Sequence, residues 1–88
     1  MQGSRLVKAD GEVDFLFRIS QTPGAYGTAN GTDWFCTTPN GLFGNISAHK
    51  VEEHNDATIT VSPSILVTVG RGGEQWHGFL ERGVWRSC

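Results

Sequence analysis

The chain has 88 residues, of which 38% are hydrophobic and 18% are charged, and its formal net charge is −2. This length predicts a single domain over residues 1–88 with a thin core, because such a chain buries only about 60% of the surface that it exposes when unfolded. The small negative charge does not favour direct binding of nucleic acid, which depends on basic patches. No apolar run reaches the roughly 20 residues that cross a bilayer, and residues 1–10 lack the apolar core of a signal peptide, so we expect a cytoplasmic protein without membrane contact.

The first half of the chain contains three short segments with the pattern of β-strands. Apolar and polar residues alternate over residues 13–19, which predicts a strand with one buried face. Residues 21–32 are rich in glycine and predict a loop. Residues 34–36 and 42–46 predict two further strands, joined by a tight turn at Asn40-Gly41, because both turn residues tolerate a positive φ.

The middle of the chain contains one polar stretch and two strands. Residues 48–56 have the only composition in this region that suits a helical turn. Residues 57–61 and 65–69 alternate and are rich in β-branched side chains, which predicts strands. The segment Ser62-Pro63-Ser64 separates them, since proline cannot donate to a sheet ladder. The glycine-rich residues 70–73 predict a turn.

The C-terminal residues predict a β-hairpin. Residues 75–80 and 84–86 flank Glu81-Arg82-Gly83, and Gly83 is expected to take the positive φ. The whole pattern predicts an all-β, mainly antiparallel fold: a small β-sandwich or partly open barrel with this C-terminal hairpin and at most one short helical turn. Because so small a domain has little means of covering its strand edges, a homodimer through an exposed edge is one assembly that the sequence allows.

Cysteine and histidine residues offer one chemical hypothesis, a zinc site. If Glu81 pairs with Val84 in the hairpin, His77 lies opposite Cys88, while Cys36 precedes a turn. Thiolate and imidazole are the ligands that zinc prefers, so Cys36, His77 and Cys88 are the predicted metal ligands. The alternative is that Cys36 is a small buried hydrophobe and Cys88 an exposed terminal residue. Two cysteines in a reducing cytoplasm do not predict a disulfide framework.

The other nucleophilic and basic residues carry weaker signals. His49 and His54 are five residues apart, which suits neither one face of a strand nor one face of a helix, so we expect solvated loop residues. Ser62 and Ser64 flank Pro63 without a GxSxG motif, so their expected role is hydrogen bonding at a strand break. The sequence therefore favours a non-enzymatic protein.

Three tryptophans and five phenylalanines are more than so thin a core needs to bury. Trp76 and Trp85 lie on the two arms of the predicted hairpin, where they can stack across it. Two interpretations stay open. Both rings form the core, or one is an exposed anchor for a partner protein beside Arg82 and Arg86, since Trp and Arg are enriched at binding hot spots. The second interpretation predicts a partner-binding surface of Trp76, Arg82, Trp85 and Arg86.

The C-terminal third resembles a known family. The run SPSILV at residues 62–67, WHGFL at 76–80, then RGVW and a terminal cysteine resemble small phage and prophage proteins of unknown function, some of them mislabelled as ammonia monooxygenases. The resemblance covers residues 57–88 and extends weakly to residues 34–36. Members often have further cysteines near the position of Cys36, which this chain lacks. The resemblance implies a phage origin and no particular activity.

Size, resemblance and the missing catalytic motif together lead to a functional expectation. We expect a phage-encoded interaction protein that binds a host or defence-system protein in the infected cell and inhibits or redirects it, for example as an anti-CRISPR or other anti-defence factor. A small zinc-dependent hydrolase using Cys36, His77 and Cys88, with His49 or His54 as a further ligand, is the first alternative. A minor virion component is the second.

Overall fold

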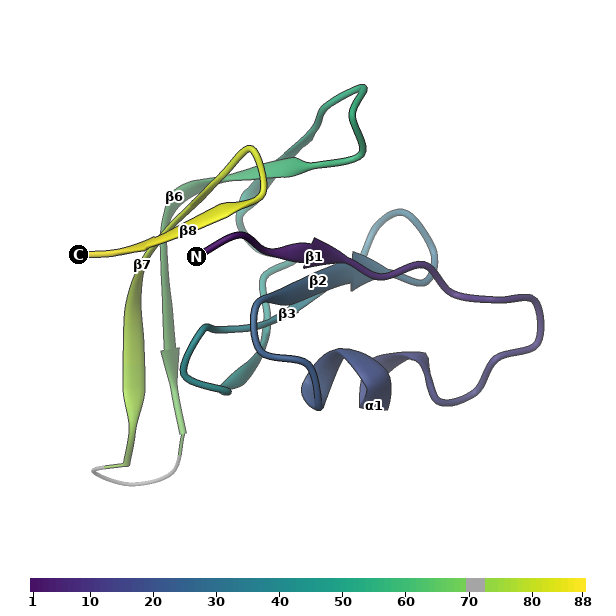
Figure 1. Cartoon of the computed structure of the whole chain (residues 1–88), viewed down its shortest axis with the longest axis horizontal. Coiled ribbons are helices and arrows are strands. Elements are labelled where there is room, and N and C mark those ends of the chain that lie inside the picture. The colour runs from purple at the N-terminus through teal and green to yellow at the C-terminus, as the bar shows by residue number, and fades with distance from the viewer. Residues whose placement is uncertain (70–72) are drawn as a thin grey trace.

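The computed structural model describes residues 1–69 and 73–88, which form two four-stranded sheets and one short helix, α1 (Phe15–Ser20) (Figure 1). The first sheet consists, in spatial order, of β1 (Ser4–Arg5), β2 (Ala25–Thr28), β3 (Trp34–Thr37) and β4 (Phe43–Asn45). The second consists of β5 (Lys50–Glu53), β6 (Ile59–Thr68), β7 (Gln75–Glu81) and β8 (Val84–Ser87). Only β1 and β2 pair in parallel among these strands. The predicted all-β, mainly antiparallel fold class is confirmed.

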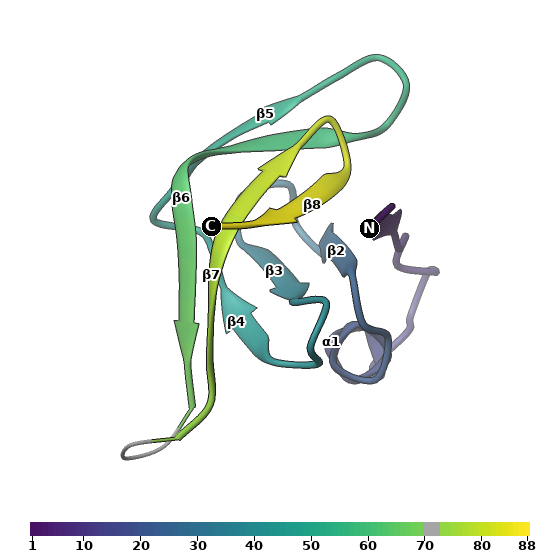
Figure 2. The same ribbon diagram turned by 60° about the vertical axis from the view of Figure 1, so that its left-hand side comes forward.

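The two sheets pack against each other around the main core. Tyr26 and Trp34 of the first sheet and Ile65, Leu80 and Trp85 of the second belong to one buried cluster. The helix α1 covers the other face of the first sheet, and in Figure 2 it is seen end-on beside β2 to β4, away from β6. The opposite side of the second sheet, which we call its outer face, has no covering element among the described residues.

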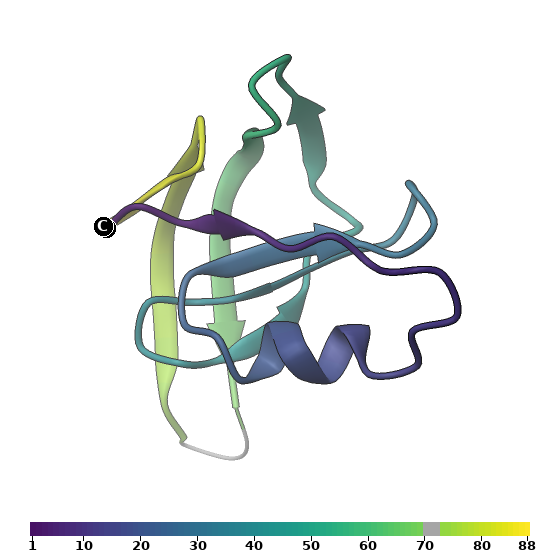
Figure 3. The ribbon, with the colours of Figure 1, turned by 45° about the vertical axis from the view of Figure 1, so that its right-hand side comes forward.

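The first residues of the chain close one seam between the sheets. Gln2 forms a bridge with Val84, Gly3 donates its backbone N–H to the carbonyl of Gly83 (2.7 Å), and Trp85 donates to the carbonyl of Met1 (2.8 Å). The start of the chain therefore meets β8, as Figure 3 shows. No ladder joins β4 to β5 among the described residues, so the two sheets stay separate along that side.

The strand predicted over residues 13–19 is wrong, because this segment contains α1. Phe15 and Ile19 are both buried against Ala25, whereas Val13 is 94% and Phe17 65% exposed. A spacing of four residues places Phe15 and Ile19 on one face of a helix, and the same residues also fit a period of two. The alternation therefore does not discriminate between the two structures, and packing onto β2 and β3 favours the helix.

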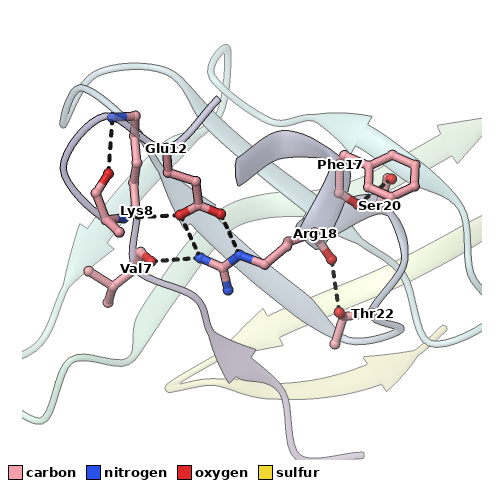
Figure 4. Close-up of polar contacts among 8 residues, drawn as sticks. Val7, Lys8, Glu12, Phe17, Arg18, Ser20 and Thr22 are labelled. Carbon is pink, nitrogen blue, oxygen red and sulfur yellow. Dashed lines mark hydrogen bonds and ion pairs between the residues drawn. The ribbon is translucent and has the colours of Figure 1, made fainter. Parts of the chain in front are cut away.

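An ion pair connects α1 to the preceding loop (Figure 4). The guanidinium of Arg18 contacts both carboxylate oxygens of Glu12, at 2.6 and 3.0 Å, and also donates to the carbonyl of Val7 (2.8 Å). The backbone N–H of Ala9 donates to Glu12 Oε1 (3.0 Å). These hydrogen bonds, with that from Arg18 first, lower the pKa of Glu12 to about 2.

Other sequence predictions divide into confirmed and wrong ones. The strands at 34–36 and 42–46 and the C-terminal hairpin are confirmed as β3, β4, β7 and β8, with Glu81 opposite Val84 and a φ of 77° at Gly83. Residues 48–56 contain β5 instead of a helical turn, because their backbone pairs with β6. The predicted loop at 21–32 contains β2. The two strands predicted around Pro63 are one strand, β6, and residues 70–72 of the predicted turn lie outside the described residues.

Candidate functional site

The three predicted metal ligands do not come together. Cys36 lies on β3 in the main core, where burial raises the pKa of its thiol to about 12, so it behaves as a small hydrophobe. His77 and Cys88 are exposed and lie opposite each other, with the N–H of Cys88 donating to the carbonyl of His77 (3.0 Å), as the hairpin register predicts. Residues 1–69 and 73–88 contain no group of three His, Cys, Asp or Glu side chains placed to hold a metal.

The structure also decides between the two interpretations of the tryptophans. Trp76 and Trp85 are both buried in the main core, and their rings meet edge to face with centroids 5.3 Å apart. The indole N–H of Trp85 donates to the carbonyl of Gly24 (2.9 Å). Neither ring is therefore a surface anchor. The predicted partner-binding surface is corrected at these two residues, which belong to the core. The two arginines of that predicted surface, Arg82 and Arg86, are exposed.

A depression on the outer face of the second sheet lies where β6 departs from regular pairing. Val61 pairs with Leu80, and Ile65 pairs with Gly78. Three residues of β6, at positions 62–64, therefore lie opposite a single residue of β7, Phe79. The extra residues make β6 bulge and leave an open hollow of about 450 Å³ on this face. Its lining residues are Thr60, Val61, Ser62, Pro63, Ser64, Phe79, Glu81 and Arg86.

Arg86 is held over this depression by two contacts. Its guanidinium carbon lies 5.3 Å from the ring centroid of Phe79, its neighbour across the β7–β8 ladder. It also forms an ion pair with Glu81. An exposed pair of this kind contributes little to stability, but together the two contacts fix the position of the guanidinium.

A serine and a histidine meet at the edge of the same depression. Ser64 Oγ lies 2.9 Å from Nε2 of His77, a side chain on the neighbouring strand. Nε2 of His49 lies 3.2 Å from the carbonyl oxygen of Ser64 and must be the donor, because a carbonyl only accepts. The Nδ1 atom of His49 is buried and has no hydrogen-bond partner among the described residues. Ser64 is thus held through both its side chain and its backbone.

His49 and His54 lie in loops, as expected, but they are less exposed than the sequence predicts. His49 and His54 are both half-buried, and Nε2 of His54 lies 2.7 Å from Oγ1 of Thr60. Ser64 bonds to a histidine side chain, whereas the sequence predicts only bonds to backbone. The sequence does not indicate the contact between Ser64 and His77, because this contact depends on the irregular pairing of β6 with β7.

Comparison with known proteins yields no match: no family model matches the chain, and no curated protein or solved structure resembles it significantly. The phage-family resemblance of residues 57–88 therefore stays a prediction. Among the described residues, no helix has both the length and the apolar character that a membrane span requires.

Proposed function

We propose that this is a phage-encoded interaction protein that binds a host or defence-system protein through the outer face of its second sheet. The observation that carries the proposal is the difference between the two sheets. The first sheet is covered by α1, while the second leaves its outer face open to solvent. The phage origin is supported by the resemblance at residues 57–88, and the host target is the expectation that follows from such an origin and from the small size of the chain.

The composition of the outer face suits a protein partner. Leu66 is 57% exposed and lies opposite His77, and Arg86 lies opposite Phe79, so these side chains form one surface across three strands. Val84 adds a further exposed apolar side chain on β8. Apolar side chains beside arginine are typical of protein-binding surfaces. The proposed surface therefore keeps Arg86, which the sequence predicts as a contact residue, and leaves out the two buried tryptophans.

Affinity capture from host lysate tests the proposal with two matched variants. Leu66→Ser combined with Arg86→Glu alters the outer face, and Val13→Ser combined with Phe17→Ser alters the exposed surface beside α1. We expect the wild-type protein and the second variant to retain a partner that the first variant loses, and the purified partner to bind directly. Circular dichroism checks that both variants fold.

Two outcomes contradict this assignment. If no host protein is retained by the wild-type chain, the interaction hypothesis fails. If the partner is lost only with the Val13/Phe17 variant, the binding surface lies beside α1. The zinc-hydrolase alternative has no comparable support, because Cys36 is in the core while His77 and Cys88 are at the surface.

A further inference from the structure

We propose that Ser64 and His77 form a reactive dyad that accepts acyl groups from small carboxylic esters. The carrying observation is the 2.9 Å separation of Ser64 Oγ and His77 Nε2 at the edge of an open depression of about 450 Å³. A serine hydroxyl is a weak nucleophile, and a neighbouring base within hydrogen-bond distance activates it. This activity goes beyond protein binding and does not depend on it.

The reaction uses only the ester, water and the two side chains. In the reactive tautomer, Ser64 donates its hydroxyl proton to the lone pair of His77 Nε2. The serine oxygen bonds to the ester carbonyl carbon, the ester C–O bond breaks, and the leaving alcohol takes the proton from Nε2. Water, deprotonated by the same nitrogen, then attacks the acyl-serine. The bond between the acyl carbon and the serine oxygen then breaks, Nε2 returns the proton to that oxygen, and the carboxylic acid is released with Ser64 restored.

The surroundings of Ser64 support this role. The contact between His49 and the carbonyl of Ser64 restrains the backbone that carries the nucleophile. Phe79 gives the depression an apolar wall, and Arg86 lines the same hollow together with Glu81, its ion-pair partner. The openness of the hollow suits a small ester that enters from solvent.

Ser62 provides an internal control. It lines the same depression on the same irregular stretch of β6, yet it has no imidazole partner among the described residues. Equal reactivity of the two serines would therefore reflect exposure alone. The exposed thiol of Cys88 lies opposite His77 and would itself react with esters, so the measurements are made in a Cys88→Ala background.

The test is labelling of the folded chain with a fluorophosphonate, followed by peptide mapping, and turnover of p-nitrophenyl acetate. We expect one adduct, on Ser64, that is absent in Ser64→Ala, unchanged in Ser62→Ala and slower by about 100-fold in His77→Gln, the lower end of what a general base contributes. Repeated release of p-nitrophenol would show that the acyl-serine is hydrolysed. No adduct, equal labelling of Ser62, or undiminished labelling of His77→Gln overturns the proposal. Loss of partner capture does not affect these readouts, so the two proposals fail separately.

Discussion

Trp76 meets the ring of Trp85 edge to face, with centroids 5.3 Å apart and an angle of 85° between the ring planes. The two residues lie on β7 and β8, and Gly78, two residues after Trp76 on β7, pairs with Ser87 of β8. A side chain at position 78 would occupy the space that the Trp76 ring fills. The contact therefore depends on a glycine, and it buries both indoles in the main core.

Gly78→Ala is predicted to destabilise the fold strongly. Its Cβ would lie 2.5 Å from Cη2 of Trp76 and 2.8 Å from the Cα of Ser87, and closer still to the carbonyl oxygen of Arg86. Because two of these neighbours are backbone atoms, we expect a loss of about 2 kcal/mol or more in the free energy of unfolding. Urea unfolding followed by tryptophan fluorescence measures it. Ser87→Ala, at an exposed neighbour, should change it by less than about 0.5 kcal/mol.

The two thiols are predicted to differ in reactivity. Cys88 is exposed and should react at once with a disulfide reagent such as DTNB, while Cys36 is buried with a pKa raised to about 12 and should react only on unfolding. One thiol per native chain and two per denatured chain are therefore expected. Rapid reaction of both thiols in the folded chain would contradict the placement of Cys36 in the core.

The same burial gives the fold a dependence on alkaline pH. The pKa of Cys36 is raised from its ordinary value of 9.0, so its contribution to stability is complete below pH 9 and is lost as pH rises toward about 12. Burial also raises the pKa of Tyr26, which acts in the same direction. Cys36→Ala should therefore reduce, without abolishing, the fall in melting temperature above pH 9.

Residue patterns alone predict the parts of the fold that depend on local periodicity and turn chemistry. The alternation in β7 and the turn glycine Gly83 determine the hairpin and its register, and hence the pairing of His77 with Cys88. The same alternation fails at α1, because Phe15 and Ile19 satisfy a period of two and a spacing of four equally well. Only packing against the first sheet decides between them.

The candidate site is less predictable, because it depends on an irregularity. Regular pairing of β6 with β7 would place one residue opposite Phe79, but residues 62–64 all face it. No sequence pattern fixes how many residues such a bulge absorbs, so the meeting of Ser64 with His77 could not be derived. The burial of Trp85 likewise depends on contacts with Gly24 and with the first residues of the chain. Because these residues are distant in sequence, the local pattern around Trp85 does not predict its burial.

The Glu12–Arg18 ion pair is predicted to give a dependence on acid pH. The pKa of Glu12 falls from its ordinary value of 4.5 to about 2, so its contribution to stability is present above pH 4.5 and disappears as pH falls toward 2. Glu12→Gln should therefore lower the melting temperature at pH 7 slightly and leave it unchanged near pH 2. Asp10→Asn serves as the control, because this exposed carboxylate on the same loop has no hydrogen-bond partner among the described residues. Equal effects of the two substitutions at pH 7 would contradict a specific role for Glu12.

Zinc is predicted not to bind stoichiometrically to the folded chain. His77 and Cys88 supply two neighbouring groups, whereas a structural zinc ion takes four ligands, and Cys36 lies in the core. Native mass spectrometry after incubation with excess zinc and buffer exchange should give the metal-free mass. One zinc per chain that is removed by a chelator and lost in Cys36→Ala would show that the three residues meet after all.

Gly3→Ala is predicted to open the seam between the first residues of the chain and β8. A Cβ at this position would lie 2.8 Å from the indole nitrogen of Trp85 and 2.9 Å from the carbonyl oxygens of Gly24 and Gly83. It would thus disturb both the indole hydrogen bond to Gly24 and the backbone bond from Gly3 to Gly83. We expect a loss of about 2 kcal/mol in the free energy of unfolding, together with faster hydrogen exchange at the amide of Trp85. Gln2→Ala, which keeps the backbone bridge and changes only an exposed side chain, should leave both quantities near wild type. Slow exchange at Trp85 in Gly3→Ala would mean that the seam is maintained by contacts other than these.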